Sequence, residues 1–255
     1  MTNFSDIDLI EPLQKTLKEK GYSTPTPIQA NAIPAAIEGH DVLGIAQTGT
    51  GKTAAFALPI LNRLGSQSRK SQPGRPLALI LAPTRELAIQ IGASLQAYGT
   101  NLRLRTCTIF GGVGQGKQVN QLRRGAHILV ATPGRLLDLI DQGFIHLDQL
   151  EVLVLDEADR MLDMGFLPPL KRIIRLLPED RQSLFFSATL PPSIGALAKQ
   201  LLSNPVNVNI APKSVDVKKI DQRFVLVEKG EKQGMLRTML SGTDVDRAIV
   251  FTKTK

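Results

Sequence analysis

Seven short apolar runs alternate with amphipathic stretches along most of this chain of 255 residues. Each run is rich in branched aliphatic residues, as is typical of a strand that is buried on both faces. The stretches between them carry apolar residues at helical spacing. Because strands that alternate with helices are joined by crossovers, this order predicts an α/β fold with a mostly parallel central sheet and helices on both faces. The predicted strands are 41–45, 77–82, 105–110, 127–131, 151–155, 183–186 and 206–210, and the predicted helices are 53–64, 85–98, 134–142, 168–177 and 191–202.

The composition excludes several classes of protein. Hydrophobic residues make up 42% of the chain and charged residues 21%, which is the balance of an ordinary globular protein. No apolar run approaches the roughly 18 residues that span a bilayer. The first residues are acidic rather than basic, unlike a signal peptide, so we expect a cytoplasmic protein. A single cysteine, Cys107, excludes a disulfide scaffold and a cysteine-based zinc site.

The charge balance points to a polyanionic partner. The formal net charge is +8, which favours nucleic acid among the possible partners. The chain has no tryptophan and two tyrosines, so stacking of bases on an aromatic surface is not the expected mode of contact. We expect contacts with the sugar-phosphate backbone instead.

A change in composition marks the predicted domain boundary. Residues 1–210 contain the seven predicted strands and form the first domain. Residues 211–219, APKSVDVKK, are polar and basic and are interpreted as a linker. After the linker, 222–227, a short helical stretch and 248–252 begin a new βαβ pattern. We therefore expect 220–255 to be the start of a second domain.

The strongest local motif is AQTGTGKT, which lies between the first predicted strand and a helix. Backbone N–H groups in such a turn can wrap phosphate oxygens, and the helix N-terminus adds a favourable dipole. Lys52 would reach the β- and γ-phosphates, and the Thr53 hydroxyl would ligate Mg²⁺. The generic P-loop pattern has glycine where this chain has Ala46. The predicted phosphate-binding residues are Ala46, Gln47, Thr48, Gly49, Thr50, Gly51, Lys52 and Thr53.

A second motif, LVLDEAD, ends an apolar strand in a cluster of carboxylates. Ligands of parallel sheets bind at the carboxyl ends of the strands, so Asp156 is expected beside the P-loop, where it would hold Mg²⁺, partly through water. Glu157 can then act on the water that attacks the γ-phosphate, as a general base or by positioning it. The alternative is a solvated acidic loop after a core strand.

A third motif, GYSTPTPIQ, supports two interpretations. Thr26, Pro27 and Gln29 fit an N-cap, an N1 proline and an N3 glutamine, which together make a capping box. The Gln29 amide also carries a donor and an acceptor that match the N6 and N7 edge of adenine. Spacing does not separate these two roles.

Together these motifs resemble the DEAD-box ATP-dependent RNA helicases of superfamily 2, and within them the bacterial RhlE-like group. Residues 21–29 look like the Q motif, with Phe4 as its upstream aromatic, and 46–53 look like motif I with the alanine that this family carries. The resemblance covers 4–255. Further matches, in the family's order, are PTRELA at 83–88, a glycine pair at 111–112, TPGR at 132–135, DEAD at 156–159, SAT at 187–189 and the opening of motif IV at 248–255.

The resemblance implies a RecA-like first domain that binds ATP with Mg²⁺ and one side of a single-stranded RNA. It implies that Lys52, Asp156 and Glu157 carry the chemistry, and that Tyr22, with Phe4 behind it, packs against adenine. Two of the RNA motifs also have structural interpretations, since 84–85 and 132–133 fit helix N-termini. The implied RNA-contacting residues are Pro83, Thr84, Arg85, Gly111, Gly112, Thr132, Pro133, Gly134 and Arg135. The residues implied to couple ATP to RNA are Asp159, Ser187, Ala188 and Thr189.

The implied activity is local unwinding of RNA duplexes driven by ATP. In this family the arginines that neutralise the γ-phosphate come from the second domain, so we expect this chain to bind nucleotide, to hydrolyse ATP barely and to unwind nothing. An ATP-gated RNA clamp or remodelling subunit is an alternative. A GTPase-like switch is disfavoured because the chain has no N-K-x-D motif.

Overall fold

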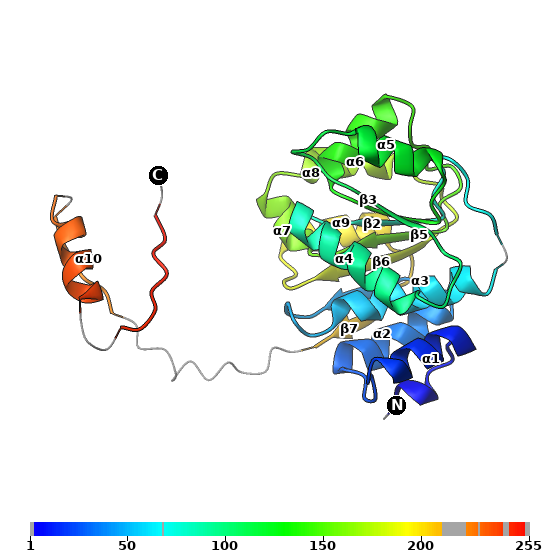
Figure 1. The fold of residues 1–255 in the computed structure, drawn as a ribbon, viewed down its shortest axis with the longest axis horizontal. Helices are drawn as coiled ribbons and strands as arrows, with labels where there is room; N and C mark the ends of the chain where they lie inside the picture. Colours follow the sequence, from blue (N-terminus) through cyan, green and yellow to red (C-terminus); the bar gives the residue numbers. More distant parts are fainter. Residues whose placement is uncertain (1–2, 68, 211–222, 229, 242–244, 253–255) are drawn as a thin grey trace. The chain divides into compact units, whose positions relative to one another are not determined.

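The protein is described from a computed structural model that covers residues 3–67, 69–210, 223–228, 230–241 and 245–252. The chain divides into two compact units, Met1–Pro212 and Lys213–Lys255. The first unit contains a seven-stranded sheet with helices on both sides (Figure 1). Among the described residues, no helix combines the length and the apolar character needed to cross a membrane.

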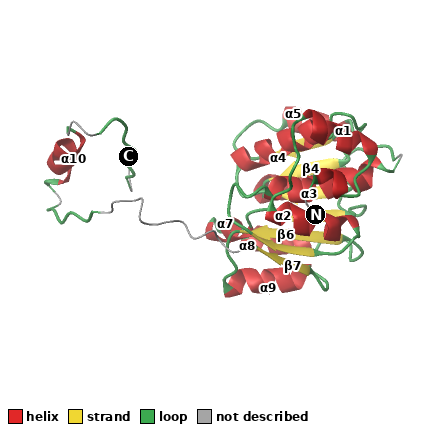
Figure 2. Cartoon of the chain, turned by 90° about the horizontal axis from the view of Figure 1, so that it is seen from below, coloured by secondary structure: helices red, strands yellow, loops and turns green. Residues whose placement is uncertain are grey.

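The sheet of the first unit has the strand order β3-β4-β2-β5-β6-β1-β7, and its strands pair in parallel. Figure 2 shows the strands lying among the helices that connect them. The strands are β1 (Val42–Ile45), β2 (Ala78–Leu81), β3 (Thr106–Ile109), β4 (Ile128–Ala131), β5 (Val152–Leu155), β6 (Gln182–Ser187) and β7 (Val206–Asn209). The helices are η1 (Phe4–Asp6), α1 (Glu11–Glu19), α2 (Pro27–Ile37), α3 (Lys52–Gly65), α4 (Arg85–Tyr98), α5 (Gly116–Arg123), α6 (Pro133–Asp141), α7 (Ala158–Asp163), α8 (Leu167–Ile174) and α9 (Pro192–Leu201).

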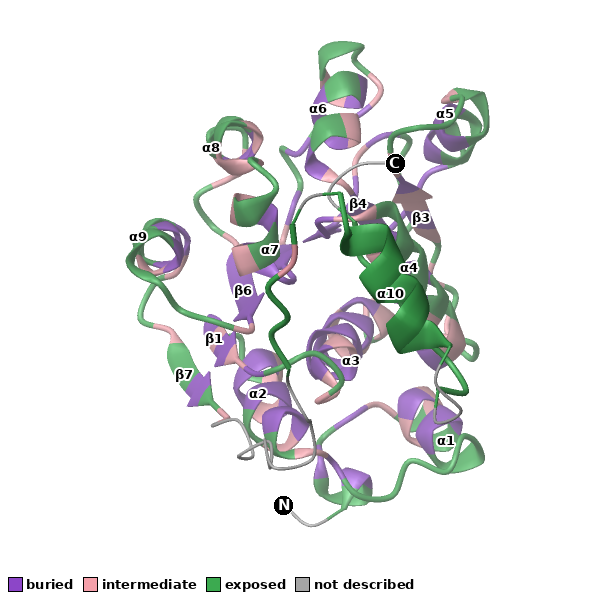
Figure 3. Ribbon diagram, turned by 90° about the vertical axis from the view of Figure 1, so that its left-hand side faces the viewer, coloured by how far each residue is buried: buried purple, intermediate pink, exposed green. Residues whose placement is uncertain are grey.

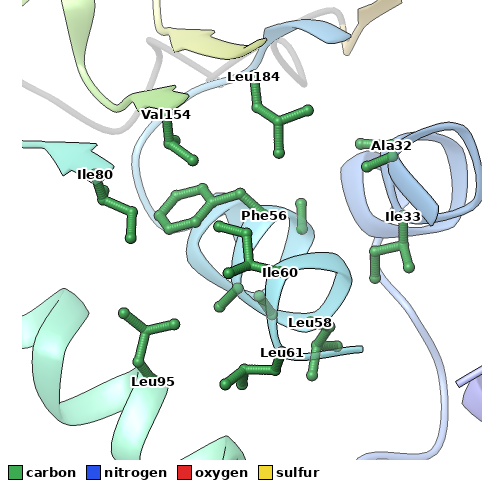
Figure 4. Close-up of a cluster of buried hydrophobic side chains, with 14 of the residues drawn as sticks. Ala32, Ile33, Phe56, Leu58, Ile60, Leu61, Ile80, Leu95, Val154 and Leu184 are labelled. Carbon is green, nitrogen blue, oxygen red and sulfur yellow. The ribbon is translucent and has the colours of Figure 1, made fainter. Parts of the chain in front are cut away.

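Two hydrophobic clusters, one on each face of the sheet, make the core. Alternate residues of a strand point to opposite faces, so Ile80 of β2 belongs to one cluster and Leu79 to the other. Helices α1 to α4 contribute to the first cluster and α5 to α9 to the second, which gives the three layers visible in Figure 3. Figure 4 shows Phe56 of α3 packed among side chains from β2, β5 and β6.

The predicted α/β fold is confirmed, and all seven predicted strands form in this unit. The five predicted helices also form and α2 begins at the predicted capping box, but four helices had no predicted counterpart: η1, α1, α5 and α7. Cys107 lies buried in β3, and burial raises the pKa of its thiol to about 12.

The second unit does not contain the two predicted strands in its described part. A helix, α10 (Lys232–Leu240), does form where the short helical stretch was predicted. The described residues 223–228 and 245–252 are not in strands, and Gln222 lies outside the described residues. The apolar side chains of these segments, such as Leu226 and Phe251, are exposed rather than packed in a sheet.

Candidate functional site

The candidate site lies at the carboxyl ends of three neighbouring strands. β6 pairs with β1 on one side and with β5 on the other. The P-loop follows β1, the acidic segment follows β5, and the SAT segment follows β6. Parallel pairing therefore brings three motifs that are far apart in the sequence to one edge of the sheet, where ligands of such sheets bind.

Two positions of the P-loop have backbone angles that only glycine adopts without strain. Gly49 and Gly51 have φ angles of 84° and 95°, in the left-handed region. The Thr50 hydroxyl donates to the Gln47 carbonyl at 2.7 Å and closes the turn. Lys52 begins α3 and is buried, and its Nζ donates to the Ala46 carbonyl at 3.0 Å. The ammonium group therefore lies inside the loop, against its first residue.

Gln29 connects the P-loop to the start of α2. Its Oε1 accepts the Thr26 N–H at 2.9 Å, as expected of a capping glutamine. Its Nε2 donates to the Gly51 carbonyl at 3.1 Å, a contact that the sequence did not predict. A side-chain amide has two donors and two acceptor positions, so one of each remains after these bonds are made. Gln29 thus fills the capping role and keeps the capacity that adenine recognition needs.

Asp156 is a buried carboxylate beside Lys52. Its Oδ1 accepts the Glu157 N–H at 3.0 Å. Burial raises the pKa of the Asp156 carboxyl to about 6, although the charge of Lys52 acts to lower it. Its negative charge is thus only partly compensated by the residues around it. A cation at this position would supply the missing compensation.

The donor atoms near Asp156 fit magnesium. The ion prefers oxygen ligands, and it is typically held by one or two protein oxygens together with phosphates and water. Asp156 supplies a carboxylate whose charge is disfavoured by burial, and Thr53 supplies a hydroxyl from the first turn of α3. These two residues, which the sequence indicated, are the ones that would hold the ion.

Glu157 has the least favourable backbone conformation in the site. Its φ of 52° and ψ of 52° are left-handed, which is uncommon outside glycine and is often found at functional residues. Its Oε1 accepts a long hydrogen bond of 3.4 Å from the Thr48 hydroxyl of the P-loop. Its Oε2 lies 3.3 Å from Nη1 of Arg160. Sequence reasoning missed Arg160; its place one helical turn after Glu157 was the available signal.

Asp159 joins the acidic segment to the SAT segment. Its Oδ2 accepts hydrogen bonds from the Thr189 N–H and hydroxyl, both at 2.9 Å. The Asp159 N–H donates to the Ser187 hydroxyl at 3.3 Å. Burial acts to raise the pKa of Asp159, but the hydrogen bonds from Thr189 and Ser187 outweigh it and the pKa is lowered. Ala188 lies between the two hydroxyl residues and holds their spacing.

The residues implied to contact RNA follow the other end of the sheet, at β2, β4 and β3. Arg85 is exposed, and its guanidinium lies 4.9 Å from the centre of the Phe110 ring. Thr84 caps α4 by accepting the Leu87 N–H at 3.2 Å, so its structural role is real. Thr132 and Pro133 likewise begin α6, with Gly134 in its first turn. Next to them Gly112, with a φ of 77°, follows Gly111 in an open loop.

The Arg135 guanidinium is bonded to other groups of the protein, although the resemblance implied that it contacts RNA. Its Nη2 donates to the Val113 carbonyl at 2.9 Å, its Nη1 to Gln118 at 3.3 Å, and its Nε lies 3.4 Å from Asp138. Gln118, which sequence reasoning missed, also bonds both backbone groups of Phe110 at 3.1 Å. These contacts tie α6 to the loop around the glycine pair, so Arg135 orients that loop.

Phe4 lies in the core behind Tyr22, which is the arrangement that the family resemblance implied. The Phe4 ring is only 2% exposed and meets the Tyr22 ring edge-on, 5.8 Å between centres. The Tyr22 hydroxyl in turn lies 3.1 Å from that of Tyr98. Phe4 therefore supports Tyr22 from the core. Tyr22 is partly exposed but has no described contact with the P-loop.

The fold and the site define a P-loop nucleotide-binding domain on a parallel sheet. More narrowly, residues 26–197 match the DEAD/DEAH box helicase family, and the chain belongs to that family. It is 42% identical to the DEAD-box ATP-dependent RNA helicase RhpA of Helicobacter pylori and 43% identical to the ATP-dependent RNA helicase CshA of Limosilactobacillus reuteri, over 99% of this chain and 50% of each relative. It is also 43% identical to DEAD-box ATP-dependent RNA helicase 30 of rice, over 99% of this chain and 38% of the relative. The chain thus spans about half the length of relatives such as RhpA and CshA.

Proposed function

We propose that this chain is the nucleotide-binding half of an ATP-dependent RNA helicase that separates short RNA duplexes locally. The observation that carries the proposal is the contact of three motifs at one sheet edge: Lys52 beside Asp156, Thr48 with Glu157, and Asp159 with Thr189. These contacts join the phosphate site to the catalytic carboxylate, and they join the acidic segment to the SAT segment.

When phosphates bind, Lys52 would exchange its hydrogen bond to the Ala46 carbonyl for bonds to phosphate oxygens. In the structure its ammonium group is satisfied by a single carbonyl, that of Ala46. An ammonium group has three donors, and phosphate oxygens offer stronger, charge-assisted bonds. Magnesium held by Thr53 and Asp156 would neutralise charge on the β- and γ-phosphates. The Gln29 amide would keep its bond to Gly51 and read adenine with its remaining donor and acceptor.

Glu157 is proposed to position the attacking water and to take its proton. Thr48 contacts one of its carboxylate oxygens and Arg160 the other, so the group is oriented before substrate binds. Asp159 would then report the nucleotide state to Ser187 and Thr189, whose strand lies between the P-loop and the acidic segment. RNA phosphates would lie across the ends of β2, β4 and β3, near Arg85 and the glycine pair.

We infer that residues 1–210 are the first RecA-like domain, 211–219 a linker and 220–255 the opening of a second domain. The proposal rests on the change in composition after 210 and on the family resemblance. If the neutralising arginines belong to the second domain, this chain turns over ATP slowly, since such an arginine contributes roughly 10³ to 10⁵ in rate. The RhlE-like subgroup and the cytoplasmic location also remain predictions.

The test is steady-state ATP hydrolysis with and without single-stranded RNA. It compares this chain with a longer protein that includes the second domain, and Glu157→Gln in the longer protein serves as the blank. We expect only the longer protein to turn over ATP and RNA to accelerate it. Comparable RNA-stimulated turnover by this chain alone would contradict the division of labour between two domains. ATP that prolongs RNA residence without releasing a duplex strand would favour the RNA clamp instead.

A further inference from the structure

A groove follows the edge strand β3 from one end of the sheet to the other. It consists of three hollows of about 840, 640 and 670 Å³. The first begins at Arg85 and Phe110, and it shares Gln96, Thr106 and Gln121 with the second. The second shares Leu104 and Arg105 with the third. Neighbouring hollows share lining residues and follow one another along β3, and we call the three together the β3 groove.

The lining of the β3 groove is positively charged throughout. No aspartate or glutamate lines any of the three hollows. Of the basic residues only Arg69 is paired with a carboxylate among the described residues, that of Glu151. A lining of one sign concentrates the electrostatic potential along the groove. Beyond Arg85, the basic residues are Lys117, Arg124, Arg105, Arg103, Lys70 and Arg69.

The far end of the groove is held in place by a buried histidine. His127 is 4% exposed, and its Nδ1 accepts the Arg105 N–H at 2.9 Å. Its Nε2 lies 3.1 Å from the Arg69 carbonyl and is therefore the donor nitrogen. The Arg105 guanidinium donates to the Arg124 carbonyl at 2.7 Å. One neutral imidazole thus connects the backbones of two basic segments and fixes them side by side.

We propose that the β3 groove binds the phosphate backbone of RNA that continues past the motif residues. This inference rests on the proposed function, because the groove begins at Arg85, one of the residues expected to contact RNA. Evenly repeated phosphates suit a row of separate cations, and such contacts read no sequence. An acidic protein segment would also be attracted, but continuity with the RNA motifs favours RNA.

The experiment measures the affinity of this chain for fluorescent oligouridylates of about 6 and about 18 nucleotides at several salt concentrations. The test variant combines Arg103→Gln with Arg124→Gln, whose side chains make no described hydrogen bond or ion pair. The matched control combines Arg175→Gln with Lys199→Gln, exposed cations near the ends of α8 and α9. Both double variants lose two positive charges, and their unfolding midpoints check that each is folded.

We expect the long RNA to bind the unmodified chain more tightly than the short one. The test variant should lose that gain and keep its affinity for the short RNA, and the control should lose neither. For two lost phosphate contacts, the slope of log K against log salt should fall by about 1.4 for the long RNA, at about 0.7 per contact on a single strand.

Equal affinity for the long and the short RNA would overturn the groove alone, and so would a test variant that keeps both the tighter binding of the long RNA and the salt slope. Displacement of the long RNA by polyglutamate as readily as by unlabelled RNA would assign the groove to an acidic protein, and also overturns it. If neither RNA binds with or without ATP, the proposed function fails together with the groove.

Discussion

At the scale of single residues, Lys52 and Glu157 separate nucleotide binding from chemistry. Lys52→Ala removes the ammonium group that would hold the phosphates, and we expect it to weaken ATP binding by roughly 100-fold, from the loss of charge-assisted bonds. Glu157→Gln keeps the size and the contact to Thr48, so nucleotide affinity should be unchanged while turnover of the longer protein is lost. Titration with a fluorescent ATP analogue measures the first effect and steady-state hydrolysis the second. Equal nucleotide binding by Lys52→Ala would remove the P-loop assignment.

The sequence predicted the site residues that belong to a motif, but it did not predict the contacts that hold those residues in place. The sequence indicated Glu157 because it follows Asp156 at the end of a strand. It did not indicate that Arg160 would hold it, since an arginine in the first turn of a helix has many exposed roles. The same holds for Gln118, whose amide bonds both backbone groups of Phe110. The contact of Gln118 depends on how α5 folds back on the Phe110 loop, which spacing along the chain does not give, whereas the spacing of Arg160 only permits its contact with Glu157.

At the scale of elements, the P-loop is held against the start of α2 by Gln29, and two of its glycines test that contact. A Cβ on Gly51 would lie 2.4 Å from Gln29 Nε2, whereas a Cβ on Gly49 would meet nothing within 4 Å. Both residues have a left-handed φ, so alanine costs about 1 to 2 kcal/mol at either position. We therefore expect Gly51→Ala to lower the free energy of unfolding by clearly more than Gly49→Ala does.

Denaturant unfolding of the two alanine variants provides the measurement. The comparison cancels the backbone strain that they share, so the excess loss in Gly51→Ala reports the clash with Gln29. In a protein that already carries Gln29→Ala, the loss caused by Gly51→Ala should fall towards that caused by Gly49→Ala, because the clashing amide is gone. Equal losses for the two glycine variants would contradict the close approach of α2 to the P-loop.

Elements were predictable in proportion to how much of them is buried. Strands β2, β4, β5 and β6 were found because a strand buried on both faces is an unbroken apolar run, whereas the edge strand β7 is mostly exposed and buries only Val208. Helix α5, with the sequence GKQVNQLR, buries few apolar residues and shows little periodicity, and α7 has six residues and begins at the strained Glu157. The strands expected at 222–227 and 248–252 fail for the opposite reason. Their composition suits a strand, but their apolar side chains, such as Leu226 and Phe251, are exposed rather than packed in a sheet.

At the scale of the whole molecule, the two units differ in how much apolar surface they bury. The first unit has a core on both faces of its sheet, while α10 contains no buried residue and Phe224 is 94% exposed. A helix of nine residues without tertiary packing is marginal in water, because nucleation is costly and few hydrogen bonds repay it.

Hydrogen exchange followed by mass spectrometry should therefore find α10 amides exchanging nearly as fast as in a peptide. Amides of β2, β4 and β5 should exchange only through global unfolding, at rates slower by several orders of magnitude. A chain shortened after residue 212 should keep its unfolding midpoint, because α10 contains no buried residue and Leu226 and Phe251 are almost fully exposed. Strong protection of α10, or a lower midpoint in the shortened chain, would contradict the expectation that α10 gains no stability from tertiary packing.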